Sequence, residues 1–159
     1  MNNKQQDDFM MQEIQLSADN MRANRGGPFG AIIVKDGKIV STGGNEVTSA
    51  NDPTAHAEIV AIRRACQKLN TFNLEGCTIY SSCEPCPMCL GAIYWARLDR
   101  LCFGGTREDA TKAGFDDSPI YDEVSKDWDK RSKKTCNCCR KAAQKVFEEW
   151  IAKPDKISY

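Results

Sequence analysis

The chain is organised around two motifs, Asp52-Pro53-Thr54-Ala55-His56-Ala57-Glu58 and, after a further 26 residues, Pro85-Cys86-Pro87-Met88-Cys89. Each motif stands where a helix is expected to begin, because proline and a capping Asp or Thr are typical of helix starts. We expect one helix over about residues 55–69, capped by Asp52 or Thr54, and another over about residues 86–96. Both helix starts therefore carry side chains that can bind a metal ion.

Three of these side chains can hold one ion together. Cys86 and Cys89 are three residues apart, so they share a face of a helix, and His56 supplies a third ligand from the facing helix start. One imidazole and two thiolates suit Zn²⁺, and three protein ligands leave a fourth position for water, which is typical of a catalytic site. The positive ends of both helix dipoles favour thiolates and neutral histidine, the forms that bind zinc.

Glu58 lies two residues after His56 and is predicted to be a proton shuttle, because a carboxylate beside zinc-bound water can take its proton and pass it on. Two other interpretations of the motifs remain. A fourth thiolate from Cys83 would close the site and make it structural, although Glu84-Pro85 separates Cys83 from the expected helix. The other is a non-catalytic zinc module that only binds a partner.

Periodic patterns place further elements around the two motifs. Apolar residues at helical spacing predict a helix over about residues 9–24, which Arg25-Gly26-Gly27-Pro28 ends. A β-hairpin is expected at Asp36-Gly37. The predicted strands are residues 29–34, 38–41, 77–81 and 100–103, and a short helix is expected over 107–113. Strands separated by helices predict a mixed sheet covered on both faces.

The C-terminal part carries fewer signals. Ile120–Lys134 is polar and charged and is predicted to be a surface loop, and a final helix is expected over about residues 140–152. Between them, Thr135-Cys136-Asn137-Cys138-Cys139-Arg140 brings three cysteines together. Buried or free thiols, a second metal site and a response to oxidation are all compatible with this cluster.

Composition and charge exclude several classes of protein. The 159 residues suffice for one domain, and 41% of them are hydrophobic, too many for a disordered chain. No apolar run is long enough for a membrane helix, and Met1–Asp8 lacks a signal segment, so a cytoplasmic location is expected. Basic and acidic residues both number 22, which argues against a nucleic-acid groove. Nine cysteines, an odd number, favour metal binding or free thiols.

The two motifs also resemble a known family. His-x-Glu followed by Pro-Cys-x-x-Cys is the signature of zinc-dependent nucleobase and nucleoside deaminases. Gly27-Pro28-Phe29-Gly30-Ala31 and Gly91-Ala92-Ile93-Tyr94-Trp95 are similar to the same superfamily. Ala113-Gly114-Phe115-Asp116-Asp117-Ser118 and the last helix with the terminal Tyr159 narrow the resemblance to the short, bacterial type of guanine deaminase.

This resemblance implies an α/β fold of three α-β-α layers around a mixed five-stranded sheet, the cytidine deaminase-like fold. It implies one domain over residues 1–159, one Zn²⁺ per subunit, and the hydrolysis of guanine, a small purine base, to xanthine and ammonia. It also implies a homodimer in which about residues 135–159 swap between subunits. The family's last strand would fall where the three clustered cysteines stand.

The resemblance further assigns roles to individual residues. His56, Cys86 and Cys89 would bind zinc and Glu58 would move protons. The remaining roles concern the purine: Asn45 would hydrogen-bond it, Phe29 would stack on it, Asp117 would contact it and help to move a proton, Tyr159 would enter the neighbouring subunit's site, and Ala57 and Trp95 would line the pocket. The residues alone also allow a turn at Asn45, core positions for Phe29 and Trp95, a helix cap at Asp117 and a frayed terminus at Tyr159.

Other substrates remain open at this point. Transfer-RNA adenosine deaminases share the zinc motif, and Lys126–Lys156 carries ten basic residues against five acidic ones. Arg107–Asp127, however, carries three basic residues against seven acidic ones, which interrupts the continuous basic track that RNA requires. Guanosine, cytosine and a pterin-like ring are further substrates that the motif permits.

Overall fold

The computed structural model describes residues 3–158 and divides into two compact units, Met1–Asp117 and Ser118–Tyr159. The first unit contains a sheet with the strand order β2-β1-β3-β4. The strands are β1 (Gly30–Lys35), β2 (Lys38–Gly44), β3 (Cys77–Cys83) and β4 (Arg100–Gly105). β1 is antiparallel to both of its neighbours, whereas β3 and β4 are parallel, so the sheet is mixed as expected.

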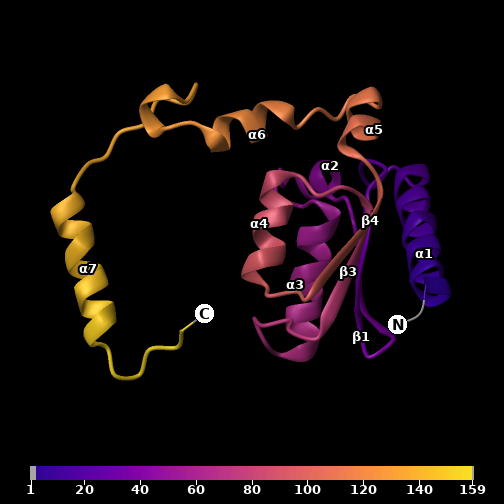
Figure 1. Ribbon diagram of the computed structural model, residues 1–159, viewed down its shortest axis with the longest axis horizontal. Coiled ribbons are helices and arrows are strands. Elements are labelled where there is room, and N and C mark those ends of the chain that lie inside the picture. The colour runs from indigo at the N-terminus through magenta and orange to yellow at the C-terminus, as the bar shows by residue number, and fades with distance from the viewer. Residues whose placement is uncertain (1–2, 159) are drawn as a thin grey trace. The chain divides into compact units, whose positions relative to one another are not determined.

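Helices cover both faces of this sheet. α1 (Asn3–Arg22) lies on one face, and α3 (Ala57–Leu69) and α4 (Pro87–Trp95) lie on the other (Figure 1). Side chains along β1 alternate between the two layers, as the period of a strand requires. Ala31 and Ile33 join the core beneath α3, whereas Ile32 and Val34 pack with residues of α1. The three-layer arrangement that the sequence predicts is confirmed.

The expectation of a fifth strand is wrong for the described residues, because the sheet has four. The segment proposed for that strand, residues 135–139, has no regular structure. Cys139 has φ 55°, a left-handed conformation that interrupts an extended chain. Within residues 3–158, β4 therefore pairs with β3 alone.

Turn chemistry accounts for the remaining elements of the first unit. Asp36 and Gly37 both have positive φ, 49° and 71°, as a two-residue hairpin of the primed type requires, so the predicted hairpin is confirmed. Two short helices, α2 (Val47–Ala50) and α5 (Arg107–Lys112), follow β2 and β4. A capping box starts α5, in which Thr106 and Asp109 bind each other's backbone N–H.

The second unit consists of α6 (Ser118–Ser125), the 3₁₀ helix η1 (Trp128–Lys130) and α7 (Arg140–Ala152). The prediction of α7 is confirmed. The expectation of a loop over Ile120–Lys134 is wrong for residues 120–125 and 128–130, which are helical, and holds for the rest of that segment. Ile120 and Val124 stand one turn apart, and an ion pair between Lys126 and Glu123, 2.7 Å long, supports the end of α6. Within residues 3–158, no helix combines the length and apolarity that crossing a bilayer requires.

Candidate active site

Three metal-binding side chains converge at the starts of α3 and α4. The sulfurs of Cys86 and Cys89 each lie 3.5 Å from Nδ1 of His56, and all three donor atoms lie within 4.8 Å of one another. A tetrahedral site with Zn–S near 2.3 Å and Zn–N near 2.0–2.1 Å separates sulfur from nitrogen by about 3.6 Å. The donors therefore fit one tetrahedral Zn²⁺ as they stand, with Nδ1 as the ligand nitrogen.

Two of these side chains stand at helix N-caps and do not bind the backbone of their helices, so they are available to a metal ion. His56 and Cys86 are the N-cap residues of α3 and α4, both in extended conformation, and neither side chain caps its helix. An N-cap side chain ordinarily accepts from the first N–H groups of its helix. The expectation that Asp52 or Thr54 caps α3 is wrong, because Asp52 Oδ1 instead accepts from the N–H and hydroxyl of Thr54, at 2.8 and 2.7 Å.

The donor set also has the electrostatics that a cation requires. Hydrogen bonding by the Cys89 thiol, assisted by His56, lowers the pKa of Cys86 to about 4, although burial opposes this effect. The pKa of Cys89 is raised, because its proton is shared with the Cys86 thiolate and the site is buried. One thiolate thus forms from the protein's own contacts, and a divalent cation supplies the positive charge that favours the second.

Glu58 supplies a buried carboxylate beside the three donors. Only 7% of the residue is exposed, the Ser81 hydroxyl donates to its Oε1 at 3.3 Å, and its Oε2 lies 3.4 Å from the sulfur of Cys89. Burial raises the pKa of this carboxyl, so it is a stronger base than a solvated glutamate. Its position in the first turn of α3 agrees with the predicted role in proton transfer.

Cys83 does not complete a closed metal cage. Its thiol donates to the carbonyl of Thr106 at 3.5 Å, and burial together with the charge of Glu58 raises its pKa to about 11, so it stays protonated. Among residues 3–158, no fourth His, Cys, Asp or Glu joins the cluster of His56, Cys86 and Cys89. A zinc ion held by these three residues would keep a fourth position for water, as the catalytic interpretation requires.

Asn45 is buried at the end of β2, and its carboxamide has a fixed orientation. Its Oδ1 accepts from the N–H groups of Gly27 and Val47, both at 3.3 Å. Among the described residues, no hydrogen bond from its Nδ2 is found, so the amide presents a donor rather than an acceptor. The N–H of Asn45 also donates to the carbonyl of Phe29 at 3.0 Å, which ties the two predicted purine-binding residues together.

Phe29 belongs to an aromatic pair. Its half-buried ring meets Phe115 edge to face, with 4.9 Å between ring centroids and 84° between planes. Gly27 permits this packing, since a Cβ at that position would stand 3.2 Å from the ring of Phe29. Phe29 also packs against the core beneath α3, so the core position and a surface for a planar ring are compatible.

The other predicted site residues divide into two groups. Ala57 is fully buried directly after His56, and Asp117 interacts with Cys86, whose charge adds to burial in raising the pKa of Asp117. Oδ1 of Asp117 is buried without a hydrogen-bond partner within residues 3–158, so it has an acceptor to offer. By contrast, Trp95 stands 68% exposed at the far end of α4 from the cysteines, and Tyr159 lies outside the described residues.

Two residues that support the site, Ser81 and Phe115, were not predicted from the sequence. Ser81 holds Glu58, and the period of β3 points to it, because Cys77, Ile79 and Ser81 share the face that α3 covers. Phe115 packs on Phe29, and its signal is its place two residues before Asp117. Serine and phenylalanine are too common to indicate a role by residue type. Only the alternation of side chains along β3 and the motif that contains Asp117 could have indicated these two residues.

His56, Cys86 and Cys89 would hold one zinc ion, and the buried carboxylate of Glu58 lies beside them. Such a set of residues is typical of one class of protein, the hydrolytic zinc enzymes that activate water. Residues 4–105 match the zinc-binding region of cytidine and deoxycytidylate deaminases. The chain belongs to this family of zinc-dependent deaminases.

Individual relatives are more specific. The chain is 52% identical to a guanine deaminase of Bacillus subtilis (strain 168) over 124 residues, 78% of this chain and 80% of that protein. It is 51% identical to a tRNA-specific adenosine deaminase of Aquifex aeolicus over 76 residues, 48% of this chain and half of that protein. The first likeness thus spans 124 residues of this chain and the second only 76.

Two solved structures are also similar to this chain, over different shares of its length. The X-ray structure of guanine deaminase from Bacillus subtilis superposes with a TM-score of 0.94 and 45% identity, covering 100% of this chain and 99% of that one. The protein NE0047, solved in complex with 8-azaguanine, superposes with a TM-score of 0.65 and 35% identity, covering 68% of this chain and 63% of that one.

Proposed function

We infer that this chain is a guanine deaminase, which hydrolyses guanine to xanthine and ammonia with one Zn²⁺ per subunit. Guanine is inferred as the substrate because the structure is similar to that of the Bacillus subtilis guanine deaminase over the full length of the chain. The His56, Cys86 and Cys89 cluster with Glu58 supports the chemistry, because each element of a zinc-dependent hydrolysis is present.

The reaction replaces the amino group on C2 of guanine by the oxygen of water. Zinc, when bound, lowers the pKa of a coordinated water and so supplies a nucleophile near neutral pH. Glu58 takes one proton from the attacking water and delivers it to a ring nitrogen. It then takes the remaining proton from the hydroxyl on C2 and gives it to the amine, so that the C2–N bond breaks, ammonia leaves and the C2 carbonyl forms. Ser81 holds Oε1 of Glu58, which leaves Oε2 beside the metal ligands for this transfer.

The purine contacts follow from the groups that the site leaves unpaired. Asn45 directs a donor amide at an acceptor on the purine, since its oxygen is already bound to backbone N–H groups. Asp117 offers the complementary acceptor through its unpartnered Oδ1, which suits an N–H or amino group of the base. Phe29, with Phe115 behind it, provides a ring on which a flat base stacks.

A substrate panel tests this function directly. The zinc-loaded protein is assayed against guanine, guanosine, adenine, cytosine and a transfer-RNA anticodon stem-loop. We expect xanthine and ammonia from guanine with a kcat/KM at least about 100-fold above that of adenine, cytosine and the RNA, because a site with both a donor and an acceptor rejects bases that leave one of them unpaired. Turnover of the RNA alone would contradict the proposal and favour the adenosine deaminase alternative.

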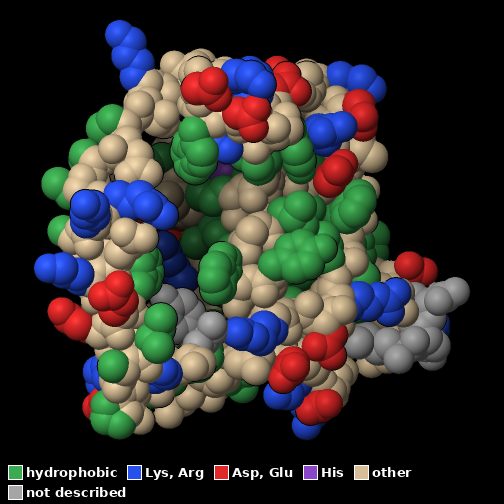
Figure 2. Space-filling view, turned by 60° about the vertical axis from the view of Figure 1, so that its left-hand side comes forward, with side chains coloured by type: hydrophobic (Ala, Val, Ile, Leu, Met, Phe, Trp, Pro, Cys, Tyr) green, Lys and Arg blue, Asp and Glu red, His purple; other side chains and the backbone are tan. Residues whose placement is uncertain are grey.

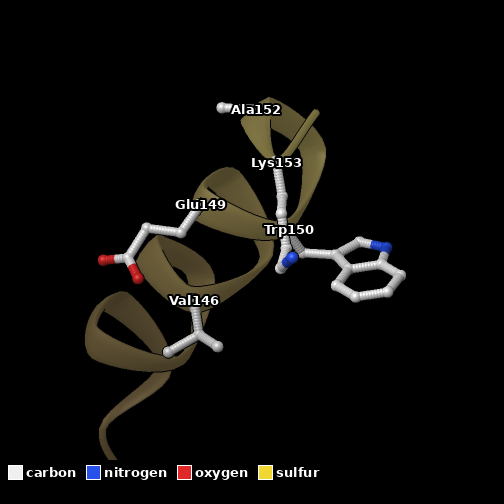
Figure 3. A pocket seen from close by; sticks show the side chains of 5 residues that line it. All are labelled: Val146, Glu149, Trp150, Ala152 and Lys153. Atoms are coloured by element: carbon white, nitrogen blue, oxygen red, sulfur yellow. The ribbon is translucent and has the colours of Figure 1, made fainter. Parts of the chain in front are cut away.

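We also propose that the chain is a homodimer whose last segment, about residues 135–159, completes the partner subunit's site. Both units expose apolar surface that a partner would cover. On α7 the exposed residues are Val146, Phe147, Trp150 and Ile151, some of which Figure 3 displays. Figure 2 shows hydrophobic side chains gathered on the α4 side of the first unit, where Tyr94 and Trp95 are 76% and 68% exposed.

Mixed dimers distinguish a swapped segment from one that stays with its own subunit. Glu58→Gln and Tyr159→Ala are each expected to inactivate a homodimer. If Tyr159 enters the partner's site, coexpression of the two variants in equal amounts restores about a quarter of wild-type activity, because half of the dimers then contain one intact site of two. No restoration, with dimers present by light scattering, would exclude the exchange.

A cytoplasmic location is part of this proposal. Among the described residues all nine cysteines are unpaired, and two of them are zinc ligands that must remain thiolates. A reducing compartment preserves such thiols, whereas an oxidising one would drive them into disulfides.

A further inference from the structure

The face of α1 that packs on the sheet carries an unusual row of polar residues. Glu13, Ser17 and Asn20 follow Phe9 at helical spacing, and all four residues are buried. A helix that covers a sheet ordinarily turns apolar side chains inward, and a buried polar side chain requires partners. The last two residues of this row find their partners in the loops that carry the proposed purine contacts.

Asn20 bridges these two loops. Its Nδ2 donates to the carbonyl of Asn45 at 2.9 Å and to the carbonyl of Gly27 at 3.4 Å. Its Oδ1 lies against Gly44, where a Cβ would come within 2.4 Å of it, so glycine is required for this close approach. The neighbouring Ser17 donates to the carbonyl of Pro28 at 3.0 Å, which fixes the same turn at a second point.

The bridge closes a small hydrogen-bonded ring around the proposed recognition amide. Asn20 binds the main chain of Asn45 and Gly27, and the side chain of Asn45 accepts from the N–H of Gly27. Asn45 also donates through its N–H to the carbonyl of Phe29. The direction of the Asn45 amide and the position of the Phe29 backbone therefore both depend on a carboxamide that lies in another layer of the fold.

We propose that Asn20 is a positioning residue for base recognition: it fixes Asn45 so that the Nδ2 group faces the purine. The inference rests on the proposed function, in which Asn45 and Phe29 contact the base. The hydrogen bonds of the Asn20 side chain do not involve His56, Glu58 or the cysteine ligands. Asn20 therefore acts on the binding of the base and not on the hydrolytic step, so its loss should change KM and leave kcat nearly unchanged.

The test compares Asn20→Ala and Asn20→Ser with Asn45→Ala. We expect Asn20→Ala to raise KM for guanine and Kd for 8-azaguanine, measured by calorimetry, about 10–100-fold, with kcat within about threefold of wild type and zinc content unchanged, because the lost contacts orient only the binding amide. Asn20→Ser retains a donor and is expected to be intermediate. Asn45→Ala sets the upper limit of the effect.

Ser41→Ala is the matched control. Ser41 is also buried, and its hydroxyl donates to the carbonyl of Ala61 at 2.8 Å, so its removal costs a comparable hydrogen bond away from the purine loops. We expect this variant to lose stability without a change in KM. Asn20 variants that behave like Ser41→Ala would overturn the positioning role while leaving the proposed function intact. An unchanged KM in Asn45→Ala would instead contradict the purine contact itself, and the inference with it.

Discussion

Glu58→Gln is expected to lower kcat for guanine by about 10²–10⁴-fold, the usual range for the loss of a general acid–base group. The amide has the same shape and still accepts from Ser81, so the packing around Oε1 is preserved. It has no basic oxygen to take a proton from water, and so it cannot pass one to the ring or to the leaving amine. Zinc content, measured by atomic absorption, and the circular dichroism spectrum are expected to stay as in the wild type.

Glu84→Gln provides the control for this substitution. Glu84 lies in the same region, but its carboxylate accepts from the N–H of Arg107 at 3.2 Å instead of lying beside the metal ligands. The same chemical change there is expected to leave kcat within about threefold of wild type, since no proton of the reaction passes through it. Retention of full turnover by Glu58→Gln would refute the proposed mechanism, and simultaneous loss of zinc would mean that the residue supports the metal.

Glu13→Gln is expected to make the protein markedly more stable in mild alkali. Glu13 is fully buried beneath α1. Burial and then the charge of Glu58 raise its pKa from 4.5 to about 8, although Ser82 partly opposes this shift. The folded protein therefore keeps a proton that the unfolded chain releases above pH 4.5, which makes unfolding progressively easier as the pH rises.

The size of this effect follows from the two pKa values. Between pH 4.5 and about 8 the wild type is expected to lose on the order of 5 kcal/mol of unfolding free energy through this carboxyl, at about 1.36 kcal/mol per unit. Above pH 8 the loss levels off, because both states are then ionised. Glutamine mimics the protonated acid at every pH, so the variant is expected to lack this slope.

Urea unfolding of the zinc-loaded proteins at pH 6 and pH 9 measures the difference. Asp8→Asn is the control, because Asp8 is exposed on the same helix and its removal leaves the slope of the wild type. Equal pH dependence in wild type and Glu13→Gln would show that Glu13 is accommodated as a charge. A variant less stable than the wild type at both pH values would point to a contact that only the acid makes.

Local patterns predicted most of the metal centre and much of the fold. Cys86 and Cys89 are three residues apart, and helix geometry alone predicts that their side chains lie on one face. The apolar spacing of residues 140–152 likewise predicts α7. The first helix is already formed at residue 3, ahead of the predicted start at about residue 9, because its first turns are polar and leave no periodic signal. α6 was missed for a similar reason: its charges obscure the one-turn spacing of Ile120 and Val124.

Long-range contacts account for what the sequence did not disclose. A polar residue at helical spacing has the same signature whether it faces water or a loop, so Asn20 gives no sign that it binds Asn45 across 25 residues. The expected fifth strand came from the family resemblance, and the clustered cysteines, with a left-handed Cys139, do not support one. Tertiary contacts and not local preference decide both cases.

The convergence of His56 with Cys86 has a mechanical consequence. The two ligands are 30 residues apart in sequence, and the chain between them includes all of α3 and β3. A metal ion that binds both residues in the folded chain would join the ends of this loop, and its binding free energy would add to the stability of the fold. Removal of zinc by a chelator would therefore lower the stability of the segment that contains α3 and β3, in addition to abolishing activity. The lifetime of the enzyme in a cell would then depend on the supply of zinc.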